Sequence, residues 1–102
     1  MTKTELLGVI LDIVCQVCEV SMEDLCSMRK SESIVQARCI YVTECLLYGL
    51  PAGVIAQKLN RQRVVSVYDC ARNHAIYRRQ SYSYREMCAQ VDRNLSEMYP
   101  RC

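Results

Sequence analysis

The sequence predicts an all-α protein of about six helices, folded as a single compact domain over residues 1–102. Apolar residues recur every three to four positions through most of the chain, which is the spacing of one face of an α-helix. Hydrophobic residues make up 51% of the chain and charged residues 24%, a composition typical of globular proteins. Two cores of half this length would each bury too little surface, so one domain is expected.

Two helices are predicted before residue 30. The first spans about Thr4 to Glu19, with apolar residues on one face and acidic residues on the other. Ser21 is a predicted N-cap with Asp24 three residues later, which indicates a short second helix containing Leu25 and Met28.

The third helix is predicted to begin at Ser31 or Ser33 and to lie at the centre of the fold. Its apolar residues occupy two neighbouring stripes, so several faces must be covered by other helices. These residues are Ile34, Val35, Ala37, Tyr41, Val42, Cys45, Leu46 and Tyr48.

A helix-turn-helix is predicted over residues 51–78. Gly49 is typical of a helix C-cap, and Pro51 is tolerated in the first turn of the next helix, which runs to about Leu59. Asn60 can adopt the left-handed conformation that turns the chain into a further helix. In that helix one face is predicted to be buried and the opposite one polar. The first face holds Val64, Val67, Tyr68, Ala71 and Ala75, and the second holds Gln62, Ser66, Asp69 and Asn73.

An extra C-terminal helix is predicted over residues 81–99, from about Tyr82 until Pro100 stops it. We expect Tyr77, Tyr82 and Tyr84 to form its interface with the preceding helix, because a base-stacking platform would need rings exposed along a groove.

The charge is distributed unevenly. The net charge is only +2, but residues 1–26 hold one Lys against five acids, whereas residues 61–85 hold six Arg against the single Asp69. A basic cluster that includes a candidate recognition helix is typical of a phosphate-binding surface, and a solvated helix face is the alternative.

Two stretches of the chain resemble the DNA-binding domain of the bacterial replication initiator DnaA. Residues 14–40 read VCQVCEVSMEDLCSMRKSESIVQARCI, similar to that family's acidic helix, Val-Ser-x-Glu-Asp-Leu segment, basic loop and long central helix. The resemblance resumes over residues 50–72, where Ser66-Val67 corresponds to the family's Thr-Val, and the DnaA-like core spans residues 14–79. It implies a helix-turn-helix protein that binds double-stranded DNA in replication or transcription control.

The chain departs from the family pattern at positions that read DNA. Residues 62–65, Gln-Arg-Val-Val, replace Arg-Asp-His-Ser/Thr, and Glu32 and Gln36 stand where the family has Arg. A carboxylate repels phosphate, and the missing arginine weakens contact with a narrow minor groove. We therefore expect a target other than the initiator's usual site.

The predicted DNA contacts combine phosphate and base-edge groups. Gln and Asn pair best with adenine in the major groove, and Asp69 can accept from a cytosine amino group. Arg72, Arg78 and Arg79 either contact phosphates or complement the helix dipole. The full set is Arg29, Lys30, Gln36, Arg38, Arg61, Gln62, Arg63, Val65, Ser66, Asp69 and Asn73.

Other chemistry is not expected. Cys15 and Cys18 form a CxxC pair without a second pair to complete a zinc site, and the eight cysteines are predicted to be reduced thiols of a cytoplasmic protein. No signal peptide and no apolar run of about 20 residues is present, so no membrane contact is expected. His74 is the only histidine and no nucleophile has a base, which argues against an enzyme and against a cofactor.

A protein-interaction module is the alternative function. Such a protein would keep the DnaA-like fold and use the acidic first helix or the added last helix to contact a protein partner. A homodimer through the last helix would suit either function, and the sequence leaves it open.

Overall fold

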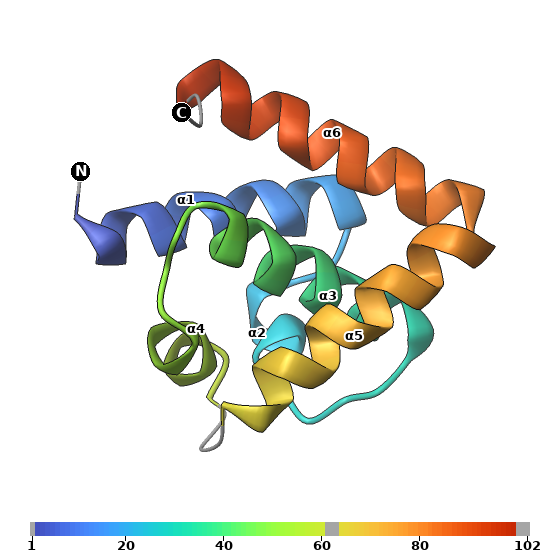
Figure 1. Cartoon of the computed structure of the whole chain (residues 1–102), viewed down its shortest axis with the longest axis horizontal. Coiled ribbons are helices and arrows are strands. Elements are labelled where there is room, and N and C mark those ends of the chain that lie inside the picture. The colour runs from blue at the N-terminus through green and yellow to red at the C-terminus, as the bar shows by residue number, and fades with distance from the viewer. Residues whose placement is uncertain (1, 61–63, 100–102) are drawn as a thin grey trace.

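The computed structural model describes residues 2–60 and 64–99, and that part of the chain forms six α-helices and no strand. Figure 1 shows their arrangement, which confirms the predicted all-α class. The helices are α1 (Lys3–Cys18), α2 (Met22–Leu25), α3 (Glu32–Leu47), α4 (Ala52–Lys58), α5 (Val65–Gln80) and α6 (Tyr82–Met98).

Side-chain caps begin three of the helices. Thr2, Ser21 and Ser81 each accept a hydrogen bond from the main-chain N–H three residues later, at 3.0–3.2 Å. The cap predicted at Ser21 is confirmed. The second helix is shorter than predicted, because it ends at Leu25 and leaves Met28 outside, 73% exposed.

The turns on either side of α4 follow the sequence. Gly49 has φ of 80° after α3, and Asn60 has φ of 57° after α4. Glycine reaches this left-handed region without a steric cost, and asparagine visits it more readily than most residues. Both residues adopt the left-handed conformation that the sequence predicts.

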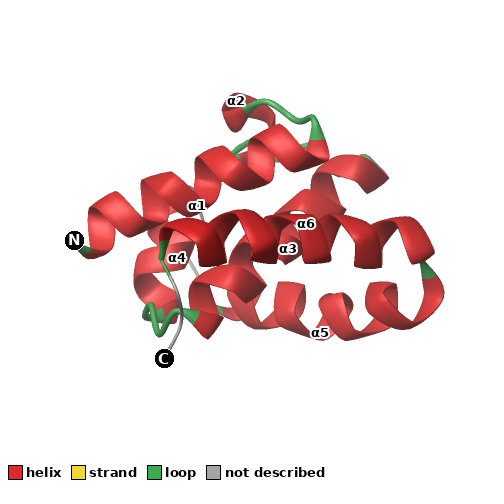
Figure 2. Cartoon of the chain, turned by 90° about the horizontal axis from the view of Figure 1, so that it is seen from above, coloured by secondary structure: helices red, strands yellow, loops and turns green. Residues whose placement is uncertain are grey.

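The third helix is the centre of the molecule. α3 packs against each of the other five helices and buries ten of its sixteen residues. Figure 2, which looks down on α6, shows α6 running between α1 and α5 with α3 beneath them. The prediction of a central third helix is confirmed.

The last helix is part of this core. Tyr84, Val91 and Leu95 of α6 are each fully buried. The hydroxyl of Tyr48, the C-cap residue of α3, donates to the main-chain carbonyl of Tyr99 at 2.6 Å. The apolar stripe of α6 is therefore covered by α1, α3 and α5 of the same chain.

The buried face of α5 differs from the prediction. Val64, Tyr68 and Ala75 were predicted to be buried and are exposed, Tyr68 by 57%. The residues turned inward are the buried Val67 and the half-buried Cys70, Ala71, His74 and Tyr77, of which Val67 and Ala71 belong to the predicted face. This inward face of α5 packs against α3 and is rotated from the face that the periodicity predicted.

Candidate nucleic-acid interface

The outer face of α5 presents several of the predicted base-reading residues together. Ser66, Asp69 and Asn73 are three and seven residues apart, a spacing that places them on one side of a helix. Asp69 and Asn73 are exposed, Ser66 is half-buried, and Val65 in the first turn is 48% exposed. The three remaining predicted contacts in this region, Arg61, Gln62 and Arg63, lie outside the described residues.

Asp69 has a cationic neighbour on the same face. Its carboxylate forms an ion pair with Arg72 one turn further along, and both side chains are largely exposed. An exposed pair of this kind contributes little stability, so the guanidinium can exchange the carboxylate for another anion. Arg72 offsets the negative charge of Asp69 on the outer face of α5.

The loop between α2 and α3 lies beside the end of α4. The Cys26 thiol donates to the main-chain carbonyl of Lys58 at 3.5 Å, which joins the two segments. Lys30 in the loop and Lys58 are both exposed, and Figure 1 shows this loop and the start of α5 at the same end of the molecule. Lys58 was not among the predicted contacts, because charge alone does not show which segments meet.

Arg29 is exposed and partly engaged. Its guanidinium lies 3.6 Å from the Asp24 carboxylate, and its side chain is 72% exposed. The position still permits contact with a phosphate, because such a long and exposed ion pair is weak.

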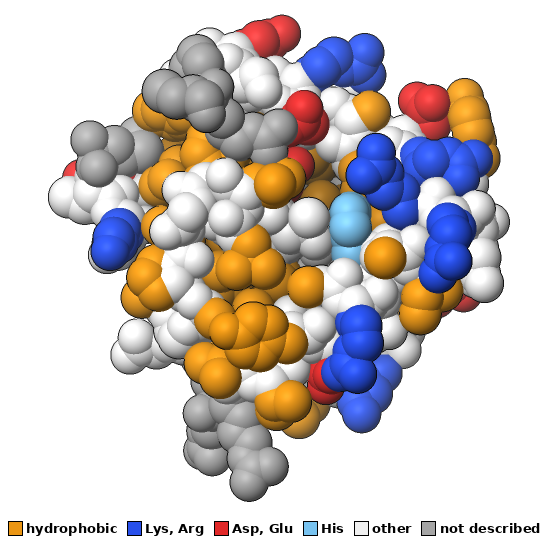
Figure 3. Space-filling view, in the orientation of Figure 1, with side chains coloured by type: hydrophobic (Ala, Val, Ile, Leu, Met, Phe, Trp, Pro, Cys, Tyr) orange, Lys and Arg blue, Asp and Glu red, His pale blue; other side chains and the backbone are white. Residues whose placement is uncertain are grey.

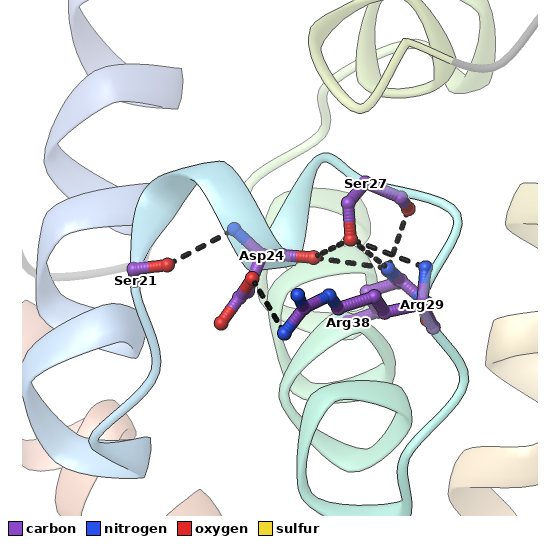
Figure 4. A network of polar contacts seen from close by, with 5 residues as sticks. All are labelled: Ser21, Asp24, Ser27, Arg29 and Arg38. Atoms are coloured by element: carbon purple, nitrogen blue, oxygen red, sulfur yellow. Dashed lines mark hydrogen bonds and ion pairs between the residues drawn. The ribbon is translucent and has the colours of Figure 1, made fainter.

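Arg38 has a different position from the one expected of a phosphate ligand. It is only 6% exposed, and its guanidinium donates inward to the main-chain carbonyls of residues 24, 25, 27 and 29. Figure 4 shows the group enclosed by this loop, where the Ser27 hydroxyl also donates to the Asp24 carbonyl at 2.6 Å. Arg38 builds the loop that carries Arg29 and Lys30, and its donors are directed away from solvent.

Gln36 is also turned away from solvent. It is 8% exposed, and its side-chain amide donates to a Glu32 carboxylate oxygen at 3.4 Å, one turn earlier in α3. The predicted groove contact at Gln36 therefore has no exposed side chain to make it, whereas Glu32 is exposed at the start of α3.

The far end of α5 is linked to α6 by an aromatic cluster. The Tyr77 and Tyr84 rings lie 5.3 Å apart, and Tyr84 also contacts the His74 ring edge-on at 5.4 Å. Burial, and then the nearby Arg78, lower the pKa of His74. The interface predicted for Tyr77 and Tyr84 is confirmed, but Tyr82 is 69% exposed and lies outside it.

The described cysteines are all free thiols. Burial is the main cause that raises the pKa of Cys18 to about 12, of Cys45 to about 12 and of Cys88 to about 11. Thiols with such values are poor nucleophiles and poor metal ligands at neutral pH. Within residues 2–60 and 64–99 no three His, Cys, Asp or Glu side chains gather as a metal site would require.

The fold and this surface define a small all-α protein in which α5 follows α4 along the chain and presents an exposed outer face. No helix in the described ranges combines the length and the apolar character needed to cross a bilayer. No protein-family model, no curated protein and no solved structure matches the chain.

Proposed function

We propose that the protein is a non-enzymatic DNA-binding protein that places α5 in the major groove of a duplex. The exposure of α5 carries this proposal, because only Val67 of its sixteen residues is buried. A helix of this length spans about 24 Å, and the major groove admits an α-helix. The resemblance to the DnaA domain supports the same use of this helix, in bacterial replication or transcription control.

Side chains of two kinds would contact the duplex. Ser66 and Asn73 offer hydrogen-bonding groups for base edges, and the exposed methyl groups of Val65 suit contact with a thymine methyl group. Lys30 in the α2–α3 loop, Lys58 at the end of α4 and Arg72 in the middle of α5 are exposed cations that suit phosphates. Arg61, Gln62 and Arg63 stay in the proposed set on the strength of the sequence.

Binding to a random duplex at several salt concentrations tests the phosphate contacts. We expect log K to fall linearly with log salt, and the double variant Lys30→Ala with Lys58→Ala to reduce the slope by about 0.9 for each phosphate that it no longer neutralises. Arg93→Ala is the matched control, because Arg93 is exposed on α6 at the opposite side of the molecule. Salt-independent binding, or no binding at low salt, would refute the proposal.

Selection from a pool of random duplexes tests base reading. We expect the wild type to enrich a motif, and Asn73→Ala to relax one position of it while the salt slope stays the same. If Asn73→Ala enriches the same motif with the same strength, Asn73 does not read a base.

A protein-interaction module is the second candidate, and one observation favours it. Tyr68 is 57% exposed and Ile76 42% exposed, two turns apart on α5, so this helix offers an outward apolar surface. A partner helix or sheet would cover it. A defined partner that binds the wild type and the Lys30→Ala with Lys58→Ala variant equally, and does not bind Tyr68→Ser with Ile76→Ser, would favour this function over DNA binding.

α6 has little exposed apolar surface that a second copy of the chain could cover in a homodimer. The apolar residues in the middle of α6 are buried or half-buried within the chain, and only Tyr82 and Met98 near its two ends are exposed large hydrophobic residues. The other exposed side chains of α6 are mostly polar, including Glu86, Gln90 and Arg93. Light scattering gives the oligomeric state directly.

A further inference from the structure

A hollow of about 370 Å³ lies between α3, α5 and α6, away from the outer face of α5 proposed to contact DNA. Figure 3 looks onto this side of the molecule, where Lys and Arg side chains gather over the end of α5 and the start of α6, beside the histidine. The polar residues around the hollow are Thr43, Glu44, His74, Arg78, Arg85 and Asp92. We call it the α3/α5/α6 hollow.

One wall of the hollow is cationic. Arg78 and Arg85 stand on either side of the turn between α5 and α6, and Arg85 donates from Nη1 to the Arg78 main-chain carbonyl at 2.7 Å. Within the described part of the chain, no carboxylate lies at ion-pair distance from either guanidinium. His74, Arg78 and Arg85 also line an adjoining hollow of about 390 Å³, so this wall is reached from both. Guanidinium groups present paired donors that match phosphate or carboxylate oxygens.

Three other polar residues that line the hollow, which we call the far wall, carry acceptors. Asp92 follows Arg85 by two turns of α6, or about 10 Å along the helix, and Glu44 extends from α3. The Thr43 hydroxyl oxygen is buried next to them and has no hydrogen-bond partner among the described residues. Carboxylate and hydroxyl oxygens attract hydroxyl and amino donors.

We propose that the α3/α5/α6 hollow binds a small organic anion that has a phosphate or carboxylate group at one end and hydroxyl or amino donors at the other. The anionic group would lie against Arg78 and Arg85, and the donors would face Thr43, Glu44 and Asp92. The volume lies within the range of known ligand pockets, and a few polar groups around an apolar lining of Ile40, Leu47 and Ala89 are typical of them.

Calorimetric titration with four probes tests this site and does not depend on DNA binding. The probes are ribose 5-phosphate and glutamate, each compared with its bare anionic group, as inorganic phosphate or acetate. We expect at least one of the two larger molecules to bind about tenfold more tightly than its bare group, because the far wall adds hydrogen bonds to charged groups. The better of the two identifies phosphate or carboxylate as the anchoring group.

Variants test which part of the probe each wall of the hollow binds. Arg78→Gln should lower the affinity for the preferred probe about tenfold or more. Asp92→Asn should reduce the difference in affinity between that probe and its bare anionic group. Arg79→Gln is the matched control, since Arg79 neighbours Arg78 and lines the adjoining hollow but not the α3/α5/α6 hollow. The affinity of this variant for the preferred probe should stay within about twofold of the wild-type value. Circular dichroism checks that each variant is folded.

Two results would overturn the proposal. The first is that neither larger probe binds more tightly than its bare group. The second is that Arg78→Gln and Arg79→Gln reduce affinity equally, which would mean attraction by the overall positive charge of the α5–α6 corner and not a formed site.

Discussion

The Arg38 guanidinium donates through Nε to the main-chain carbonyl of Leu25 at 2.7 Å, which ties the middle of α3 to the end of α2. The last carbonyls of a helix have no partner within the helix, and a cation at that end also complements the helix dipole. Arg38 thereby supplies hydrogen-bond donors, from inside the protein, to carbonyls at the end of α2. The burial of its charge is offset by the carbonyl oxygens around it.

We expect Arg38→Met to lower the free energy of unfolding by about 3 kcal/mol or more, because it removes several charge-assisted hydrogen bonds and leaves buried carbonyls without donors. Arg38→Lys should restore only part of this stability, since an ammonium group cannot reproduce the planar fork. Urea unfolding measures both variants. Arg93→Met, at an exposed position of α6, is the control, and it should change the free energy of unfolding by no more than about 0.5 kcal/mol. A change of that small size at Arg38 would show that the loop is held by other interactions.

The position of Arg38 also shows where sequence reasoning stops. Charge and the family resemblance place Arg38 beside Arg29 and Lys30, but they do not say whether a long side chain turns outward or inward. A signal was present in the sequence. Arg38 is flanked in α3 by Ala37, Cys39 and Ile40, and a charged residue amid apolar neighbours on a central helix is surrounded by protein.

The turns were easier to predict than the buried faces of the helices. Gly49 and Asn60 act through their own backbone preferences, which are local and can be read from the residue type. The buried face of α5 depends on how α3 and α6 meet it, so periodicity predicted the helix but placed Tyr68 on the wrong side. The α3/α5/α6 hollow brings together residues up to 52 positions apart, from Ile40 to Asp92, and no local pattern links them.

Truncation of Leu95 tests whether α6 is part of the core. Leu95 is fully buried, with 0% of its surface accessible, and we expect Leu95→Ala to cost about 2–5 kcal/mol of stability from reduced burial and the cavity left behind. Glu97→Ala, exposed on the same helix, should change stability by less than about 0.5 kcal/mol. If Leu95→Ala and Glu97→Ala have equally small effects on thermal and urea unfolding, α6 does not contribute to the core.

His74 should make stability depend on pH near neutrality. Burial, followed by the charge of Arg78, lowers the pKa of His74 in the folded protein. The unfolded chain then binds the proton more readily, so stability falls as the pH drops through the unfolded value of about 6.5. The wild type should lose more stability between pH 7.5 and 5.5 than His74→Gln does. Parallel decreases in urea unfolding would assign the dependence to other groups.

The buried thiols should react only when the protein opens. Cys39 and Cys45 are each 0% exposed, and burial is the main cause that raises the pKa of Cys45 to about 12. At pH 8 the thiolate, which is the reactive form, is therefore scarce. We expect mass spectrometry to find both cysteines unlabelled by an alkylating reagent in buffer and fully labelled in urea. Rapid labelling of Cys45 in buffer would contradict the tight packing of α3.

Substitutions at three positions should change stability through the backbone, one by lowering it and two by raising it. Gly49 has φ of 80° and open space at the position of a Cβ atom, so Gly49→Ala should cost about 1 kcal/mol from backbone strain alone. Glu19, the C-cap of α1, has φ of 56°, and Glu19→Gly should relieve that strain and add up to about 1 kcal/mol.

Gly53 supplies the matched control, because it lies inside α4 with ordinary helical geometry and equally open space. Gly53→Ala should stabilise the protein by up to about 1 kcal/mol, as alanine loses less conformational freedom in a helix. The same chemical change, glycine to alanine, is thus expected to lower the urea midpoint at residue 49 and to raise it at residue 53. Shifts of the same sign at both positions would mean that the left-handed conformation of Gly49 does not limit the choice of residue there.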